Sequence, residues 1–311
     1  KPTWSAVCTA PRSAQESNVA AHSNTAVADG PDVAFAFVQA LAGELSAGEV
    51  ELPGYPAVVA SIQQVLNDED VDIAKVVTAI GSEPAIASQI VRMANSAALN
   101  PRRIPAADLR AAITRVGLNT VRSATVSFAM SQLRVAPDLK GLEREIEDLW
   151  QRSVRVASLS QAIAKRLTQL NADAAMLAGL LQGIGRLYIL ARASKHAALY
   201  ADTQAYNHVV QTWHLQIAAA LIENWGFAPE IIEAVRTSED MDQDVRGPLT
   251  LADVLAVAAL LADYAGTPDT LKALVAASRP FQRLQLDFEA CENFMTATAE
   301  EVAQLREVLS V

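Results

Sequence analysis

The sequence has little cysteine and no long apolar run. Cys8 and Cys291 are too far apart in the chain to indicate a disulfide framework, although one bridge between them stays open. So few cysteines are most typical of a protein in a reducing compartment. The longest apolar run, 254–262, is well short of the roughly 20 residues of a membrane span. We therefore expect a cytoplasmic protein with no membrane partner.

Helix breakers and aromatic residues are also scarce. Gly and Pro number 13 each, aromatic residues make up 5%, and hydrophobic residues make up 51% of the 311 residues. Much of the apolar content is Ala and Leu, which are strong helix formers. A fold rich in turns is excluded, and a helical protein with a sizeable core is favoured. The chain starts Lys1-Pro2-Thr3-Trp4, with no signal pattern and no Met, which suggests a piece of a longer protein.

Charge is negative overall and unevenly spread. The net charge of −10 makes general binding of nucleic acid or anionic membrane unfavourable. Between residues 44 and 83 there are eight acidic residues and one basic residue, Lys75. Between residues 92 and 134 there are seven arginines and one acidic residue, Asp108. Two interpretations stay open: neighbouring helices neutralise one another, or the arginines form a basic face for an acidic partner or phosphate-bearing ligand.

Apolar residues recur at helical spacing after residue 30. Residues 1–30 lack this period and are interpreted as a linker or flexible N-terminal segment. A break at Pro137 divides the rest into an N-terminal lobe, 31–136, and a C-terminal lobe, 137–311. Gly117 is expected to end a helix. We predict an all-α protein of two packed lobes, with helices over 33–41, 58–66, 73–80, 84–95, 108–116, 121–133, 143–167, 173–181, 186–193, 209–225, 229–236, 249–264 and 288–309.

Collinear motifs in both lobes resemble those of the HDOD family. In the first lobe they are Leu52-Pro53-Gly54-Tyr55-Pro56, Ser82-Glu83-Pro84, Asn95-Ser96-Ala97 and Ala112-Ile113-Thr114-Arg115-Val116-Gly117. Here Glu83 replaces an Asp of the family pattern and Val116 replaces a Leu. In the second lobe they are Leu149-Trp150-Gln151-Arg152-Ser153, Ala178-Gly179-Leu180-Leu181-Gln182-Gly183-Ile184-Gly185 and Trp225-Gly226-Phe227-Ala228-Pro229. Each motif alone is weak, but their shared order over about 45–263 is a strong signal.

The resemblance implies an HD-like helical bundle, and it also locates a metal site that this chain has lost. Active relatives hydrolyse phosphate esters with a divalent cation held by His and Asp side chains. Arg152 stands at the first His, Gln182 at the second His and Gly183 at the adjacent Asp. A guanidinium has no lone pair for a cation, an amide oxygen is a weak neutral ligand, and Gly has no side chain. We expect Asp253 at the final carboxylate position, no metal or other cofactor, and no enzymatic activity.

The residues Arg152, Gln182, Gly183 and Asp253 thus form the predicted vestigial pocket. Arg152 either pairs with Asp253 where the metal would sit or, together with Gln182, binds the phosphate or carboxylate of a nucleotide-like ligand. Outside this pocket, His208 and His214 are six residues apart and do not share a helix face, so a structural hydrogen bond is the favoured role of His214.

Contact residues for a partner or ligand are predicted in the first lobe. Arg115 and Arg122 are seven residues apart and share a helix face, with Arg92 nearby. Asn95 is expected to satisfy backbone groups at a helix end, with partner binding as the alternative. The predicted contact residues are therefore Arg92, Asn95, Arg115 and Arg122.

Three functions follow as hypotheses. HDOD domains, as the resemblance implies, occur in bacterial signalling proteins, often joined to receiver or cyclic-di-GMP-related domains. The favoured hypothesis is a non-catalytic module that contacts signalling proteins or an upstream sensor or receiver domain. The alternative is a metal-dependent phosphohydrolase acting on nucleotides or cyclic dinucleotides, which would need a rebuilt metal site. Nucleic-acid binding through the arginines is the third, and the acidic chain argues against it.

Overall fold

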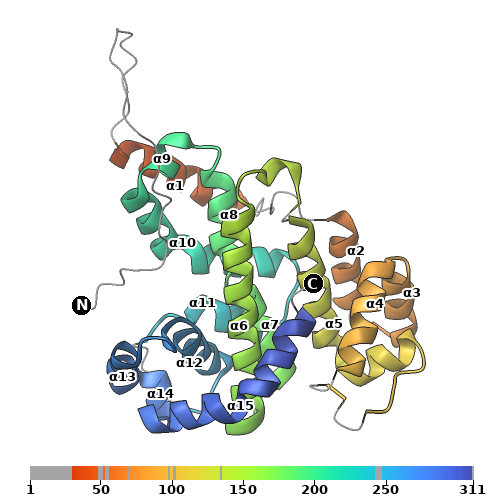
Figure 1. Cartoon of the computed structure of the whole chain (residues 1–311). Coiled ribbons are helices and arrows are strands. Elements are labelled where there is room, and N and C mark those ends of the chain that lie inside the picture. The colour runs from red at the N-terminus through yellow and green to blue at the C-terminus, as the bar shows by residue number, and fades with distance from the viewer. Residues whose placement is uncertain are drawn as a thin grey trace.

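The computed structural model describes residues 30–47, 52, 56–68, 70–96, 99–100, 103–133, 135–241 and 247–309 (Figure 1). These residues form helices and no strand, which confirms the all-α prediction. Residues 1–29 of the predicted linker lie outside this part of the chain. The helices are α1 (Gly30–Ala47), α2 (Ala57–Leu66), α3 (Ile73–Gly81), α4 (Pro84–Asn95), α5 (Leu109–Leu133), α6 (Glu143–Leu167), α7 (Ala172–Leu181), α8 (Ile184–Ala193), α9 (Ala197–Ala201), α10 (Thr203–Asn224), α11 (Pro229–Thr237), α12 (Leu251–Tyr264), α13 (Pro268–Ala277), α14 (Arg279–Arg283) and α15 (Phe288–Leu309), with a 3₁₀ turn at Pro137–Leu139.

Local sequence explains where many helices begin. Pro84 occupies the first turn of α4, where its missing N–H costs nothing. The Asp72 carboxylate accepts a hydrogen bond from the Lys75 amide at 2.8 Å and caps α3. Asn171 caps α7 in the same way. Gly117 was predicted to end a helix; it has a φ of 78° inside α5, so the two predicted helices join there across a kink.

The long helix α6 runs through the middle of the molecule (Figure 1). Its most extensive contact is with α7, and it also contacts α12 and α15. The helices α2, α3 and α4 gather around α5 at one side. The helix α1 was predicted in the N-terminal lobe, but it packs instead on α9 and α10 of the second lobe. Its apolar face, with Phe37 and Leu41 buried, finds its partner there.

The segment Ala172–Ala193, which comprises α7 and α8, is long and apolar enough to cross a membrane by length and composition alone. In the structure 94% of its most apolar window is buried inside the fold. A core helix of a folded domain passes the same test, and this segment packs between α6 and α10. It is therefore the centre of the second lobe.

Two glycines allow the helices around this segment to approach closely. An ideal Cβ on Gly179 of α7 would lie 2.5 Å from the Ala157 Cα of α6. An ideal Cβ on Gly185 of α8 would overlap the His214 carbonyl oxygen and lie 2.9 Å from the Ala218 amide nitrogen of α10. Backbone atoms cannot move aside as a flexible side chain can, so only glycine fits at either position.

We predict that Gly185→Ala destabilises the protein strongly. The added methyl group would force α8 away from α10, and overpacking of this kind costs up to about 3 kcal/mol or more. The measurement is the free energy of unfolding from urea denaturation. The matched control is Gly43→Ala in α1, where nothing lies within 4 Å of an ideal Cβ. The free energy of unfolding of this control should rise by up to about 1 kcal/mol, because alanine favours the helix more than glycine does. Equal stabilities for the two variants would contradict the packing described.

Candidate functional site

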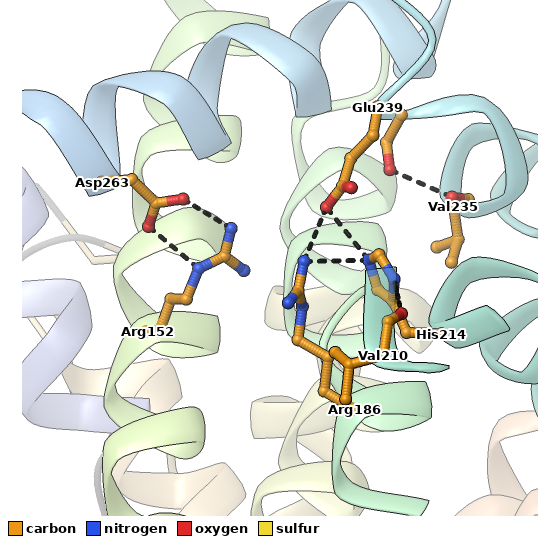
Figure 2. A network of polar contacts seen from close by, with 8 residues as sticks. Arg152, Arg186, Val210, His214, Val235, Glu239 and Asp263 are labelled. Atoms are coloured by element: carbon orange, nitrogen blue, oxygen red, sulfur yellow. Dashed lines mark hydrogen bonds and ion pairs between the residues drawn. The ribbon is translucent and has the colours of Figure 1, made fainter. Parts of the chain in front are cut away.

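The Arg152 side chain is held by a carboxylate on α12. Its Nε donates to Asp263 Oδ1 at 2.9 Å and its Nη2 donates to Asp263 Oδ2 at 2.8 Å (Figure 2). The two side chains are 18% and 23% exposed. A planar guanidinium that meets both carboxylate oxygens is fixed in direction as well as position. One side of the Arg152 fork is therefore fully occupied.

The pairing of Arg152 with Asp253 was wrong. Asp253 lies in the first turn of α12, where its Oδ2 accepts from the Thr250 amide at 2.8 Å in a capping box. Arg283 of α14 donates to both oxygens of Asp253, at 2.7 and 3.1 Å. Asp263 comes ten residues later in α12, about 15 Å along the axis. Asp253 thus anchors a helix end and is not part of the pocket.

The other two predicted pocket residues lie beside α6. An ideal Cβ on Gly183 would overlap the Oγ of Ser153, the residue after Arg152. Gly183 lies in the turn between α7 and α8, and Gln182 immediately precedes it with 1% exposure. The space that a side chain at position 183 would need is therefore filled by α6. Gly183 and Gln182 therefore lie near the part of α6 that carries Arg152, and a shared pocket of the three side chains stays a prediction.

A second polar cluster lies beside this turn and was missed in the sequence. Arg186 of α8 donates from Nη2 to Glu239 Oε1 at 2.9 Å (Figure 2). The Nε2 atom of His214 is 3.0 Å from the same Glu239 oxygen and 3.0 Å from Arg186 Nη2. The Nδ1 atom of His214 is 2.8 Å from the Val210 carbonyl oxygen, so Nδ1 carries a proton and donates. The structural hydrogen bond predicted for His214 is confirmed.

The His214 ring lies between a donor and an acceptor. The ring is 1% exposed, and its Nε2 faces both the donor Arg186 and the acceptor Glu239. Nε2 therefore has a hydrogen-bond partner, which is why a histidine can stand at this buried position.

Glu239 stays ionised well below neutral pH. Burial alone would raise the pKa of its carboxyl group. The hydrogen bond from His214 and the charges of His214, Arg186 and Arg152 outweigh burial and lower the pKa of Glu239 to about 2. The carboxylate is therefore the fixed negative charge that holds the cluster together.

The first-lobe residues predicted as contacts differ in their exposure and in their hydrogen bonds within the fold. Arg122 is used inside the fold, because its Nη2 donates to the Leu66 carbonyl at the end of α2, and burial lowers its pKa. Arg115 is exposed and donates to the Ala94 carbonyl at 3.1 Å. Asn95 accepts from the Ala106 amide at 2.8 Å, as expected for a helix end. Arg92 is exposed at the end of α4. Partner contact at Arg92, Asn95 and Arg115 stays a prediction.

The donor set does not fit a divalent cation. Within the ranges that the structure describes, no group of three or more His, Cys, Asp and Glu side chains could hold a metal ion. Around Arg152 the available groups are guanidinium and amide N–H donors, and both nearby carboxylates are already bound to arginines. A cation there would meet like charge instead of lone pairs.

The chain matches the family model described as HDOD domain over residues 52–241. A curated relative from Treponema pallidum (strain Nichols), described as an uncharacterized protein, is 24% identical over 202 residues. That match covers 60% of this chain and 37% of the relative, so the chain spans well under half of that protein's length.

Crystal structures of bacterial proteins share the fold. A proposed metal-dependent phosphohydrolase from Shewanella amazonensis aligns with a TM-score of 0.70 and 24% identity, over 89% of this chain and 99% of that one. An HDOD domain protein of unknown function from Geobacter sulfurreducens aligns with a TM-score of 0.59 and 22% identity, over 90% and 99%. A proposed signal transduction protein from Marinobacter aquaeolei aligns with a TM-score of 0.57 and 20% identity, over 91% and 69%.

We predict that Glu239→Gln lowers stability at neutral pH but not in acid. The pKa of Glu239 falls from its ordinary value of 4.5 to about 2 on folding, so the stabilising effect of the carboxylate is complete above about pH 4.5 and is lost as the pH falls toward 2. Because the Glu239 side chain is 36% exposed, we expect Glu239→Gln to lower the free energy of unfolding by about 1 to 2 kcal/mol at pH 7. The measurement is the free energy of unfolding of both proteins between pH 2 and 7.

The exposed Glu230 of α11 provides the control, since Glu230→Gln reports the effect of removing a surface glutamate. If the difference in free energy of unfolding between wild type and Glu239→Gln does not change with pH, the Glu239 carboxylate is not stabilised by Arg186 and His214 as described.

Proposed function

We propose that this chain, which belongs to the HDOD family, is a non-catalytic regulatory module that acts through protein contacts in bacterial signal transduction. Its place of action is the cytoplasm, as the sparse cysteines suggest. The partners would be signalling proteins, including a sensor or receiver domain in the same or another chain. A regulatory role needs a surface whose shape or availability an upstream event can change, and a rigid helical bundle offers one.

The observation that carries the proposal is the Arg152–Asp263 pair. It places the Arg152 guanidinium, bound to both oxygens of Asp263, where active relatives are expected to have a metal-binding histidine. The side chain of Ser153 fills the space beside Gly183 that a ligating aspartate would need. Both features oppose a metal at this position.

The second candidate is a metal-dependent phosphohydrolase. It is favoured by the description of the similar Shewanella amazonensis protein. That likeness, at 24% identity, concerns the fold, while hydrolysis depends on particular ligands. The arginines at the site could bind a phosphate but could not lower the pKa of an attacking water as a metal does.

We predict that the purified protein holds far less than one metal ion per chain and does not hydrolyse phosphodiesters. The test measures metal content by mass spectrometry after purification without chelator. Hydrolysis of bis(p-nitrophenyl) phosphate and of cyclic di-GMP is then followed with added Mn²⁺, Mg²⁺ or Fe²⁺. The rate should equal that of Arg152→Ala and of buffer. A metal-dependent rate in the wild type that Arg152→Ala abolishes would overturn the proposal in favour of the second candidate.

The exposed basic face of the first lobe is the proposed contact surface. Arg92 ends α4, and Arg110 begins α5 beside it, and both side chains are exposed. This concentration of positive charge in a chain of net charge −10 suits an acidic protein surface.

We therefore expect Arg92→Glu/Arg110→Glu to lose partners that the wild type captures from a bacterial lysate, measured by quantitative mass spectrometry. Arg144→Glu is the matched control, because Arg144 is 87% exposed on α6, outside this face. The captured proteins should also be released as salt is raised. Identical capture by wild type and the double variant would rule this face out.

A further inference from the structure

Three N–H donors near the Arg152 pair have no hydrogen-bond partner among the described residues. They are Arg152 Nη1, Arg186 Nε and Gln182 Nε2, and each atom is shielded from solvent. A buried donor without an acceptor is unfavourable, because it has lost its hydrogen bonds to water. Native proteins leave few such groups, and a bound ion or water is one explanation for those that remain.

The three donors belong to one region of the fold. Gln182 adjoins Gly183, which contacts the residue after Arg152, and Arg186 follows one helical turn later. In Figure 2 the nitrogen of Arg152 that is not bound to Asp263 points toward the Arg186–His214–Glu239 cluster. The charge of Arg152 is also among those that lower the pKa of Glu239.

The carboxylates of the site orient the arginines without saturating them. Asp263 binds Nε and Nη2 of Arg152 and leaves Nη1 unbound. Glu239 binds Nη2 of Arg186 and leaves Nε unbound. Each carboxylate balances the charge of one guanidinium, so what the unbound edges lack is a hydrogen-bond acceptor. All three unpartnered groups are donors, so the missing partner is an acceptor and not a cation.

We propose that Arg152, Gln182 and Arg186, here called the arginine site, bind the phosphoryl group of a small molecule. Three oxygens of a phosphoryl group accept hydrogen bonds from different directions, whereas a carboxylate offers two oxygens in one plane. Arginine is well suited to such a group because its fork stays charged and rigid. The Arg152 and Arg186 side chains are 18% and 25% exposed, so both reach the surface, while the three donor atoms themselves are shielded from solvent.

This inference rests on the proposed function in one respect, since the arginine site excludes a bound metal. The phosphoryl group would therefore be held and not cleaved. A ligand that joins α6, the α7–α8 turn and α8 would change how firmly these helices are held together, which is what a regulatory ligand needs to do.

The test is calorimetric titration of the purified protein with inorganic phosphate and with adenosine 5′-monophosphate, in EDTA and at constant ionic strength set with NaCl. The melting temperature is measured with and without each compound. The variants are Gln182→Met, which keeps the side-chain length but removes the donor, and Arg186→Lys, which keeps the charge but loses the fork. Arg144→Lys on the exposed face of α6 is the control.

We expect saturable binding by the wild type and by Arg144→Lys, and affinity lower by about tenfold or more in Gln182→Met and Arg186→Lys. Without ligand, Gln182→Met should melt at the same or a higher temperature, because it removes an unpaired buried donor. Tighter binding of the nucleotide than of phosphate would identify a nucleotide ligand, and equal binding would identify free phosphate.

Two results would overturn the inference. One is the absence of saturable binding of both compounds by the wild type. The other is a Gln182→Met variant that binds as tightly as the wild type, or that melts at a clearly lower temperature, because Nε2 would then have an internal partner. Neither result affects the proposed function, which fails only if the protein holds a metal and cleaves a phosphoester.

Discussion

The close approach of α7 and α8 to their neighbours is the constraint on which the site depends. The Gly179 position leaves no room for a side chain against Ala157 of α6, and Gly185 leaves none against the His214 carbonyl of α10. These two contacts fix the α7–α8 turn between α6 and α10. Gln182 and Gly183 therefore lie against the Arg152 segment, and Arg186 lies against His214. A looser packing of the same helices would separate the arginines.

Two ion pairs then hold the side chains in the directions that the packing allows. Partly buried pairs add little net stability, because desolvation of the charges offsets most of their attraction. Removing one member is costly, since it leaves a charge without a partner, and the bidentate geometry permits few alternatives. The Arg152–Asp263 pair and the Arg186–His214–Glu239 cluster thus contribute more to the shape of the site than to the stability of the fold.

The N-terminal helix is coupled to the helix that carries Arg186. The Glu44 carboxylate of α1 accepts hydrogen bonds from the Tyr188 hydroxyl and the Arg192 guanidinium of α8. Burial raises the pKa of Glu44, but these hydrogen bonds outweigh burial and lower it, so the carboxylate stays charged. A displacement of α1 would therefore act on α8 through this contact.

Helix content, the bounds of most helices and the irregular backbone at Gly117 were readable from the sequence, because each depends on residues close together in the chain. The short helices α9, α13 and α14 were not predicted. The Thr250-x-x-Asp253 capping pattern was also present and could have assigned Asp253 to a helix end. The choice of Asp263 as the partner of Arg152, 111 residues away, needed the tertiary structure. So did the cluster that joins Arg186 to Glu239 and the packing of α1 on α10. Local patterns specify which face of a helix is apolar, but the rotation and depth at which two helices meet decide which polar groups on them can touch.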